Sequence, residues 1–319
     1  MRVAILDDWL DVARSLASWD ELAELEELAV FTEHVPNEDR VAELIEPFDV
    51  VSIMRERTPF PRSLLERLPN LRLLVTTGGH NSSVDLEAAA ELGILVSGTT
   101  GIKTDTPELA WGLVLALARD LPVQDRSLRA GRWQTKLGTS LAGKRLGLLG
   151  LGYIGGEMAR FGQAFGMSVA AWSPNLTRER ASEVGVVRVS KEELLRTSDV
   201  VSIHLRLGTR SRGLLGPAEL DMMRPTALLV NTSRGPIVDE VALIDALRRG
   251  VIGGAALDVF DEEPLPADHP LMELPNTVLT PHLGYATREG FARYYQETVA
   301  AIAAFQAGAP IRVVHPRPD

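Results

Sequence analysis

Three polar side chains, each just beyond an apolar run, could carry out one reaction together. Arg234 follows one such run, Glu263 lies in an acidic cluster after another, and His282 follows a third. An arginine can grip a carboxylate through two parallel hydrogen bonds. A histidine whose charged form is stabilised by an acid can protonate a carbonyl oxygen. These residue types suit the reduction of a 2-oxo acid.

A glycine-rich segment could hold the hydride donor for such a reduction. The sequence GLGYIG at 150–155 has the G-x-G-x-x-G spacing, between an apolar run and a helical pattern. The first glycine permits a tight turn, the second lets backbone approach a pyrophosphate, and the third lets the helix lie close to the strand. The helix N-terminus then faces the anion. The candidate cofactor contacts here are Gly150, Gly152, Tyr153, Ile154 and Gly155.

Ser173 stands at the end of the next expected strand, where NAD-binding proteins usually carry an acid for the ribose 2′-hydroxyl. Without that carboxylate a 2′-phosphate is not repelled, and Asn175, Thr177, Arg178 or Arg180 could hydrogen-bond it. Ser173 could equally tolerate either cofactor. The sequence leaves NAD and NADP open, with a slight preference for NADP.

These residues need a scaffold, and the sequence predicts one of parallel strands and helices. Short apolar runs alternate with amphipathic stretches along the chain, a pattern typical of parallel sheets covered by helices on both faces. We expect strands at 3–6, 50–53, 73–76, 94–96, 145–149, 168–171, 200–203, 227–231, 252–257 and 278–280. We expect helices at 21–28, 39–45, 63–68, 85–92, 109–118, 154–165 and 288–306.

A chain of 319 residues exceeds what one hydrophobic core usually organises, so two domains are expected. The second series of strands is complete before the last helix, which would return to the first domain. The expected domains are 1–98 with 288–319, and 99–287. Each would be a doubly wound parallel sheet, with an active-site cleft between them, because ligands bind beyond the carboxyl ends of such strands.

Together these stretches resemble the D-isomer-specific 2-hydroxyacid dehydrogenase family along essentially the whole chain. The resemblance implies that Arg234 binds the substrate carboxylate and carbonyl, that Glu263 pairs with the histidine, and that His282 is the general acid and base. It implies Rossmann-like and flavodoxin-like α/β domains, the first for substrate and the second for the dinucleotide, and a D-2-hydroxy acid product, as for glyoxylate or hydroxypyruvate reductases. The matching segments are 150–155, 231–239, 258–264 and 281–287.

The resemblance also implies further contacts. Asp258 would hold the nicotinamide carboxamide, and Thr232 lies among the expected cofactor contacts. The sequence TTGGHN at 76–81 resembles the family's substrate loop, in which backbone N–H groups meet the carboxylate. The expected substrate contacts are Gly78 and Gly79 in this loop and Arg55, which matches a cation near the substrate mouth.

Three positions depart from the family's usual residues, all around the adenosine half of the cofactor. Tyr153 stands where an arginine is frequent, Arg206 replaces a usual proline, and Ser173 replaces the usual aspartate. The pyrophosphate would then rest on backbone N–H groups. The roles of Arg206, of His80 in the substrate loop and of His204 after a buried strand are left open, although a structural role is favoured for His204.

Each candidate also has a purely structural interpretation. Arg234 could be a surface ion-pair partner, and His282 could be a satisfied core histidine. Glu263 has acidic neighbours, Asp261 and Glu262, so the choice among the three acids is open. For Arg55, a ligand contact and a packing role in its loop are both open.

Composition excludes several function classes. The formal net charge of −10 gives no basic footprint for nucleic acid or an anionic membrane. Cysteine is absent, and the six histidines have no metal-ligand spacing, so no metal is expected. No apolar run reaches the roughly 18 residues of a membrane span. The N-terminal strand turns acidic too soon for a signal peptide, so we expect a cytoplasmic protein.

The segment 109–118 is apolar around most of its circumference, which indicates burial against another domain or subunit. We therefore predict a homodimer built on this segment. The partners expected are otherwise small 2-oxo and 2-hydroxy acids.

Two rival functions and the substrate are left open. One rival is an NAD(H)-sensing binding protein of the same fold without significant turnover. The other, an enzyme using formate or phosphite, needs first-domain residues that this chain lacks. A small pocket would favour glyoxylate or hydroxypyruvate, whereas Trp133, Met54 and Leu283 could line a roomier apolar one. The physiological direction is also open.

Overall fold

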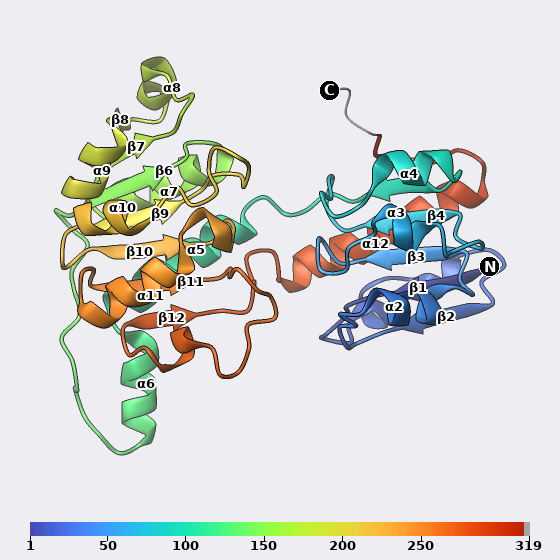
Figure 1. Ribbon diagram of the computed structural model, residues 1–319, viewed down its shortest axis with the longest axis horizontal. Helices are drawn as coiled ribbons and strands as arrows, with labels where there is room; N and C mark the ends of the chain where they lie inside the picture. The colour runs from blue at the N-terminus through green and yellow to red at the C-terminus, as the bar shows by residue number, and fades with distance from the viewer. Residues whose placement is uncertain (316–319) are drawn as a thin grey trace. The chain divides into compact units, whose positions relative to one another are not determined.

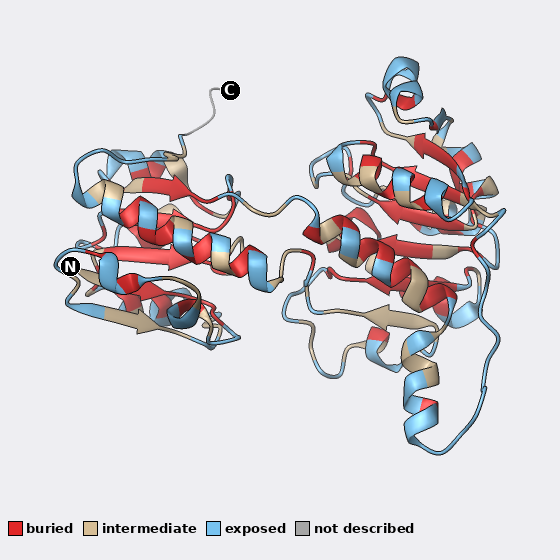
Figure 2. Cartoon of the chain, turned by 180° about the vertical axis from the view of Figure 1, so that it is seen from behind, coloured by how far each residue is buried: buried red, intermediate tan, exposed pale blue. Residues whose placement is uncertain are grey.

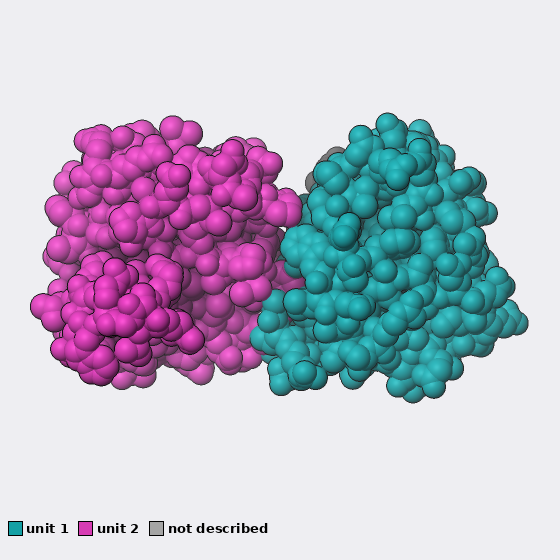
Figure 3. Space-filling view, turned by 90° about the horizontal axis from the view of Figure 1, so that it is seen from below, with its two compact units in different colours: residues 1–102, 286–319 teal, residues 103–285 magenta. Residues whose placement is uncertain are grey.

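The computed structural model describes residues 1–315, and the chain divides into two compact units (Figures 1 and 3). Unit 1 comprises Met1–Ile102 with Ala286–Asp319, and unit 2 comprises Lys103–Tyr285. Unit 1 is therefore assembled from two chain segments, and unit 2 from one continuous segment.

Unit 1 is built on a five-stranded sheet in which all neighbours are parallel, in the order β2-β1-β3-β4-β5. The strands are β1 (Arg2–Ile5), β2 (Glu27–Val30), β3 (Val50–Ile53), β4 (Leu73–Thr76) and β5 (Leu95–Gly98). The helices are α1 (Ala13–Leu16), α2 (Glu38–Ile45), α3 (Arg62–Leu65), α4 (Leu86–Glu91) and α12 (Arg288–Gln306), and η1 (Trp19–Glu21) is a 3₁₀ turn.

The central strands of unit 1 are apolar on both faces, because helices cover both sides of the sheet. Every residue of β3 and β4 is buried (Figure 2). On one face α2 contributes Val41, Ala42 and Ile45, and Asn37 caps that helix by accepting from Arg40 N. The long helix α12, from the second segment, packs against α1 and β4.

The helix predicted at 21–28 is wrong. Residues 19–21 form η1, and 27–30 form the edge strand β2, paired with β1 in the register Arg2↔Glu27. A cross-strand hydrogen bond of 2.8 Å joins Arg2 Nε to Glu27 Oε2. The leucine spacing imitates a helix, but pairing with the open edge of β1 outweighs that local preference.

Unit 2 is built on a seven-stranded parallel sheet in the order β12-β11-β10-β9-β6-β7-β8. The strands are β6 (Arg145–Leu149), β7 (Ser168–Trp172), β8 (Val187–Arg188), β9 (Val200–Ile203), β10 (Leu228–Asn231), β11 (Gly254–Leu257) and β12 (Thr277–Leu279). The helices are α5 (Asp105–Ala118), α6 (Leu121–Arg129), α7 (Tyr153–Ala164), α8 (Arg178–Glu183), α9 (Lys191–Thr197), α10 (Pro217–Met222) and α11 (Glu240–Arg249), with 3₁₀ turns η2 (Gly235–Ile237) and η3 (Pro270–Glu273).

The two faces of this sheet carry separate cores. On β6, Leu146 and Leu148 belong to the core that includes α5 and α7, whereas Leu149 belongs to the core that includes α9, α10 and α11. Alternate strand residues point to opposite faces, so each face needs its own layer of helices. The expected fold class, two doubly wound parallel α/β domains, is confirmed. Every strand expected from the sequence is present with its ends within two residues.

The apolar helix α5 has much of its surface buried within unit 2. It packs against α7, β10, β11 and β12, and Trp111 lies 4.9 Å from Phe165 between ring centroids. The unit's own core therefore accounts for much of the apolar character that suggested a partner. Large apolar side chains are exposed instead on α6 and the segment after it: Leu121, Leu128, Trp133 and Leu137.

Candidate active site

The glycine motif forms the connection between β6 and α7. Gly150 has φ +104°, and a side chain there would collide with the carbonyl of His204. A side chain on Gly155 would collide with the carbonyl of Gly150, so this glycine lets α7 lie close to the strand end. At Gly152 a Cβ would meet nothing within 4 Å. The motif thus leaves open backbone at the N-terminus of α7, where an anion is stabilised.

Ser173 directly follows β7, which pairs with β6 in the register Leu149↔Trp172. It therefore lies one strand away from the glycine turn. Two arginines, Arg178 and Arg180, lie on α8, the helix that follows this strand. A third, Arg210, donates through Nη1 to Asn175 Oδ1 at 3.4 Å. Arg210 was missed from the sequence because it comes from the segment after β9, far along the chain.

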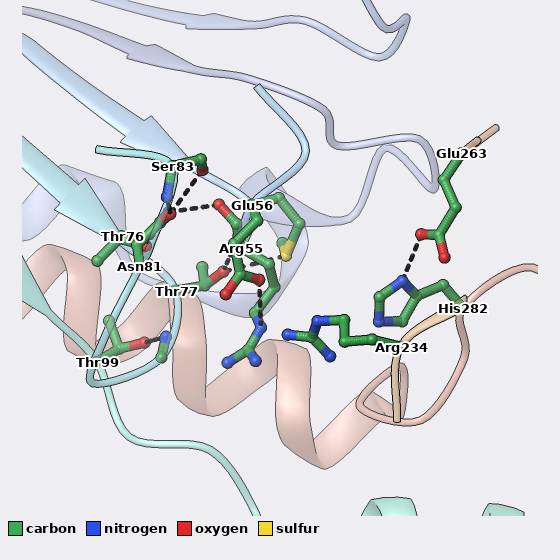
Figure 4. Close-up of polar contacts among 12 residues, drawn as sticks. Arg55, Glu56, Thr76, Thr77, Asn81, Ser83, Thr99, Arg234, Glu263 and His282 are labelled. Carbon is green, nitrogen blue, oxygen red and sulfur yellow. Dashed lines mark hydrogen bonds and ion pairs between the residues drawn. The ribbon is translucent and has the colours of Figure 1, made fainter. Parts of the chain in front are cut away.

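Arg234, Glu263 and His282 follow β10, β11 and β12, three neighbouring strands of unit 2. His282 Nδ1 lies 2.6 Å from Glu263 Oε2 (Figure 4). The other carboxylate oxygen, Oε1, accepts from Phe260 N at 3.0 Å. Of the three clustered acids, Glu263 is therefore the one in contact with the histidine.

The electrostatics of this pair favour the charged form of Glu263. Burial would raise the pKa of Glu263, but the hydrogen bond and charge of His282, the Phe260 N–H and the charge of Arg234 together lower that pKa below its ordinary value. The side chains of His282 and Glu263 are 26% and 33% exposed, so the histidine remains accessible to a ligand. The ring nitrogen Nε2 is the one not turned to the carboxylate.

A buried carboxylate holds the turn that carries His282. Asp258 accepts from Thr280 Oγ1 at 2.6 Å, from Leu283 N at 2.7 Å and from Gly284 N at 2.9 Å. Burial raises the pKa of Asp258 despite these hydrogen bonds, which act in the opposite direction. His282 itself has φ +53°, a conformation that is rare outside glycine and needs such support. This positioning role was not among the roles expected for Asp258.

Arg234 is fixed by its own turn. Asn231 donates through Nδ2 to the Arg234 carbonyl at 3.0 Å and accepts from Ser233 N at 3.0 Å. Nη1 of Arg234 donates to the Ser233 carbonyl at 2.7 Å. Thr232, between them, is buried, and its hydroxyl oxygen has no hydrogen-bond partner among residues 1–315. An orphaned buried hydroxyl at the carboxyl end of β10 fits a polar ligand such as a dinucleotide.

The substrate-contact candidates of unit 1 lie beyond β3 and β4. Arg55 has φ +55°, its N–H donates to Thr77 Oγ1 at 2.8 Å, and its carbonyl accepts from Asn81 Nδ2 at 2.6 Å (Figure 4). A side chain on Gly78 would collide with the Arg55 guanidinium. The N–H of Gly78 donates to Thr99 Oγ1 at 2.8 Å, so it is engaged within unit 1 and not directed at a ligand as expected. Gly79 is exposed.

The three residues left open fall into different environments. The imidazole of His204 is enclosed, its Nε2 lies 2.9 Å from Ser202 Oγ, and burial lowers its pKa to about 3, so it is neutral. This agrees with the structural role favoured for it. His80 and Arg206 are exposed.

Two general properties bear on what the site can bind. None of the helices in the described part of the chain has the length and apolarity to cross a bilayer. Within residues 1–315, no three His, Cys, Asp or Glu side chains are grouped so that they could hold a metal ion.

Residues 111–284 match the family model described as the NAD-binding domain of D-isomer-specific 2-hydroxyacid dehydrogenases. Over 255 residues the chain is 44% identical to the glyoxylate reductase of Aeropyrum pernix, covering 77% of this chain and 76% of that protein. It is 36% identical to the D-3-phosphoglycerate dehydrogenase of Archaeoglobus fulgidus, covering 82% of this chain but only 50% of that protein.

The solved structures lead to the same family. The phosphoglycerate oxidoreductase of Vibrio cholerae superposes with a TM-score of 0.92 at 37% identity, covering 97% of this chain and 100% of that one. The glycine motif, the paired histidine and glutamate and the preceding arginine all lie within the matched region. The chain belongs to the D-isomer-specific 2-hydroxyacid dehydrogenase family of NAD-binding oxidoreductases.

Proposed function

We propose that this protein reduces a 2-oxo acid to a D-2-hydroxy acid with NAD(P)H, by the same hydride transfer that glyoxylate and hydroxypyruvate reductases catalyse. The observation that carries the proposal is the 2.6 Å pair between His282 Nδ1 and Glu263 Oε2, with Arg234 at the end of the adjoining strand. This set joins an anion-binding group to an acid that can deliver a proton.

Arg234 is proposed to bind the substrate carboxylate and its neighbouring carbonyl oxygen. A planar guanidinium matches a carboxylate in bidentate fashion and keeps its charge at every working pH. Unit 1 is proposed to supply Arg55 and the backbone N–H of Gly79. Gly78 acts by leaving room for the Arg55 guanidinium.

His282 is proposed to protonate the carbonyl oxygen through Nε2 while Nδ1 stays bonded to Glu263. The carboxylate stabilises the imidazolium before transfer and fixes the ring orientation. In the reverse direction neutral His282 takes the hydroxyl proton. The bound nicotinamide supplies or accepts the hydride.

The residues proposed to hold the cofactor are consistent with the shape of unit 2. The open backbone at Gly152 and the N-terminus of α7, which begins with Tyr153 and Ile154, suit the pyrophosphate, and Thr232 offers its orphaned hydroxyl. A carboxylate has about four lone-pair sites. Asp258 uses three of them for its own loop, so one is left for a carboxamide N–H.

Cofactor choice is proposed to favour NADP slightly. Ser173 places no carboxylate against a 2′-phosphate, Arg178 and Arg180 lie on the following helix α8, and Arg210 contacts Asn175, two residues beyond Ser173. We expect Ser173→Asp to shift the ratio of kcat/KM for the two cofactors towards NADH. An unchanged ratio would show that this position does not set the preference.

We also propose a homodimer. The support now comes less from α5 than from the apolar side chains exposed on α6 and after it, where Trp133 is 78% and Leu137 94% exposed. Such side chains are rarely left to water in a group. Light scattering at micromolar concentration tests this, and a monomer would rule it out.

The function is tested by following nicotinamide absorbance with NADPH or NADH and a panel of 2-oxo acids. Turnover that His282→Ala abolishes, while that variant still binds NADPH, is the expected result. Tight NADPH binding by the wild type without turnover of any 2-oxo acid would favour the nucleotide-sensing alternative.

A further inference from the structure

Trp9 lies just beyond β1 in unit 1, in a place that the proposed reaction leaves unexplained. It follows the buried acids Asp7 and Asp8, and it is 37% exposed. A large aromatic side chain at the surface costs solvation free energy unless something covers it. The position is at the carboxyl edge of the sheet, where open α/β sheets bind ligands.

The loop that carries Trp9 is held firmly. Asp7 has φ +58°, and its carboxylate contacts His34 Nδ1 at 2.9 Å and Thr58 Oγ1 at 2.7 Å. Asp8 Oδ2 accepts from Ala13 N at 2.8 Å. Two buried carboxylates with these partners leave the indole little freedom, so its exposure is a fixed feature of unit 1.

Arg57, in the turn after the neighbouring strand β3, packs on the Trp9 ring. Its guanidinium carbon lies 3.8 Å from the centroid of the Trp9 ring. Its Nη1 donates to the carbonyl of Asp7 at 2.9 Å. Arg57 belongs to the turn after β3 that also contains Arg55, so Trp9 is joined to the turn proposed to bind the substrate.

The sheet order places these groups in a row. In the order β2-β1-β3-β4-β5, the strands β1 and β3 flank the topological switch point, at which ligands bind in this type of sheet. Trp9 follows β1, Arg55 follows β3, and Gly79 follows β4. Neighbouring strands lie about 4.8 Å apart, so the row spans roughly 10 Å. A two-carbon acid held at β3 and β4 would not reach β1.

We infer that Trp9, held by Arg57, is the wall that receives the side chain of the substrate, and that the enzyme takes 2-oxo acids with a bulky apolar or aromatic substituent on C3. The inference rests on the proposed function, since it assigns the far end of the same substrate. Burial of such a substituent against an indole provides a favourable hydrophobic contribution.

The experiment compares kcat/KM for phenylpyruvate, 4-methyl-2-oxopentanoate and glyoxylate in the wild type and in Trp9→Ala. The readout is the selectivity ratio of each bulky acid to glyoxylate, because a general loss of folding or cofactor binding lowers all three values together. We expect that ratio to fall by about tenfold or more in Trp9→Ala. Trp9→Phe, which keeps an aromatic wall, should restore most of it.

Leu92→Ala is the matched control. Leu92 is also an exposed apolar residue of unit 1, at 44%, but it ends α4 just before β5 begins, at the opposite edge of the sheet. Its ratio should equal that of the wild type. Equal ratios in Trp9→Ala and the wild type would overturn this inference alone. Failure of the wild type to reduce any of the three acids would overturn the proposed function and this inference with it.

Discussion

Arg55 and His282 both lie beyond a strand in left-handed backbone, and their turns are held in different ways. Arg55 in unit 1 has φ +55° and His282 in unit 2 has φ +53°. The backbone of the Arg55 turn is held by neutral groups, the Thr77 hydroxyl and the Asn81 amide, and the Arg55 side chain lies 3.9 Å from the Glu56 carboxylate. The His282 turn is held by the buried carboxylate of Asp258 and paired with a second carboxylate, Glu263.

The difference follows from what each side chain must do. A guanidinium keeps its proton at any working pH, so the Arg55 turn needs only rigidity. An imidazole has to gain and lose a proton near neutrality, so its charge must be tuned by its surroundings. Two carboxylates contact the His282 turn, and they make the turn sensitive to substitution.

The largest expected difference is between the kinetic effects of removing the two side chains, His282 and Arg55. His282→Ala should lower kcat for reduction by roughly 10²–10⁴-fold, as expected for loss of a general acid, with little change in cofactor affinity. Arg55→Ala should mainly raise KM, because it removes an anchor and not a proton donor. Steady-state kinetics with a fixed NADPH concentration separates the two. A larger loss of kcat in Arg55→Ala than in His282→Ala would reverse the comparison.

The next largest difference is expected between the residues that hold the two turns, Asp258 and Asn81. Asp258→Asn replaces an acceptor with a group that cannot accept from all three donors, and leaving a buried donor unsatisfied costs about 1–3 kcal/mol. Asn81→Ala removes neutral hydrogen bonds to Arg55, Thr76 and Ser83, each worth about 1 kcal/mol. Urea denaturation measures both. Because the His282 turn loosens, kcat should also fall in Asp258→Asn but not in Asn81→Ala. Equal effects on kcat would mean that Asp258 does not position His282.

The charge of Glu263 should affect the pH profile of the reduction. The hydrogen bond and charge of His282 lower the pKa of Glu263, and in general a carboxylate beside an imidazole favours the protonated ring. Reduction needs that imidazolium, so activity falls as pH rises, and in Glu263→Gln the fall should begin at lower pH. The shift expected from losing a charge-assisted hydrogen bond is about one pH unit. If the basic limbs of the variant and the wild type coincide, Glu263 does not tune His282.

A second histidine, His204 just after β9, sharpens the comparison because it is neutral. Burial lowers the pKa of His204 to about 3 from its usual 6.5. Below pH 6.5 the unfolded chain binds a proton that the folded chain does not, so this stability is present above pH 6.5 and lost as pH falls towards 3. From pH 6 to pH 5 the wild type should lose about 1 kcal/mol more stability than His204→Asn. Parallel losses in urea titrations would contradict this.

Most of the scaffold could be predicted from the sequence because parallel strands buried on both faces give uninterrupted apolar runs. The three neighbouring strand ends after β10, β11 and β12 could be found in the same way. The edge strand β2 could not, since it is half-exposed and its leucines have helical spacing. Local pattern carries no information about an open edge elsewhere in the sheet.

The types of residue in the site could be predicted from the sequence, but the contacts between their side chains could not. Asp261, Glu262 and Glu263 are all acidic, so residue type alone does not distinguish them. In the fold it is Glu263 that contacts His282. The multiple bonds of Asp258 involve residues 22 to 26 positions away. The engagement of the Gly78 N–H by Thr99 likewise depends on pairing between β4 and β5.

The division of unit 1 into two segments sets an order of synthesis. Its sheet is made first, but α12, which packs on α1 and β4, emerges only after all of unit 2. Unit 2, being continuous, can complete its own contacts while unit 1 still exposes apolar surface that Tyr294, Tyr295 and Ile302 will later cover. Domains generally fold as units during translation, and contacts between distant segments close slowly. During translation the apolar surface that α12 covers therefore stays exposed until the whole of unit 2 has been synthesised.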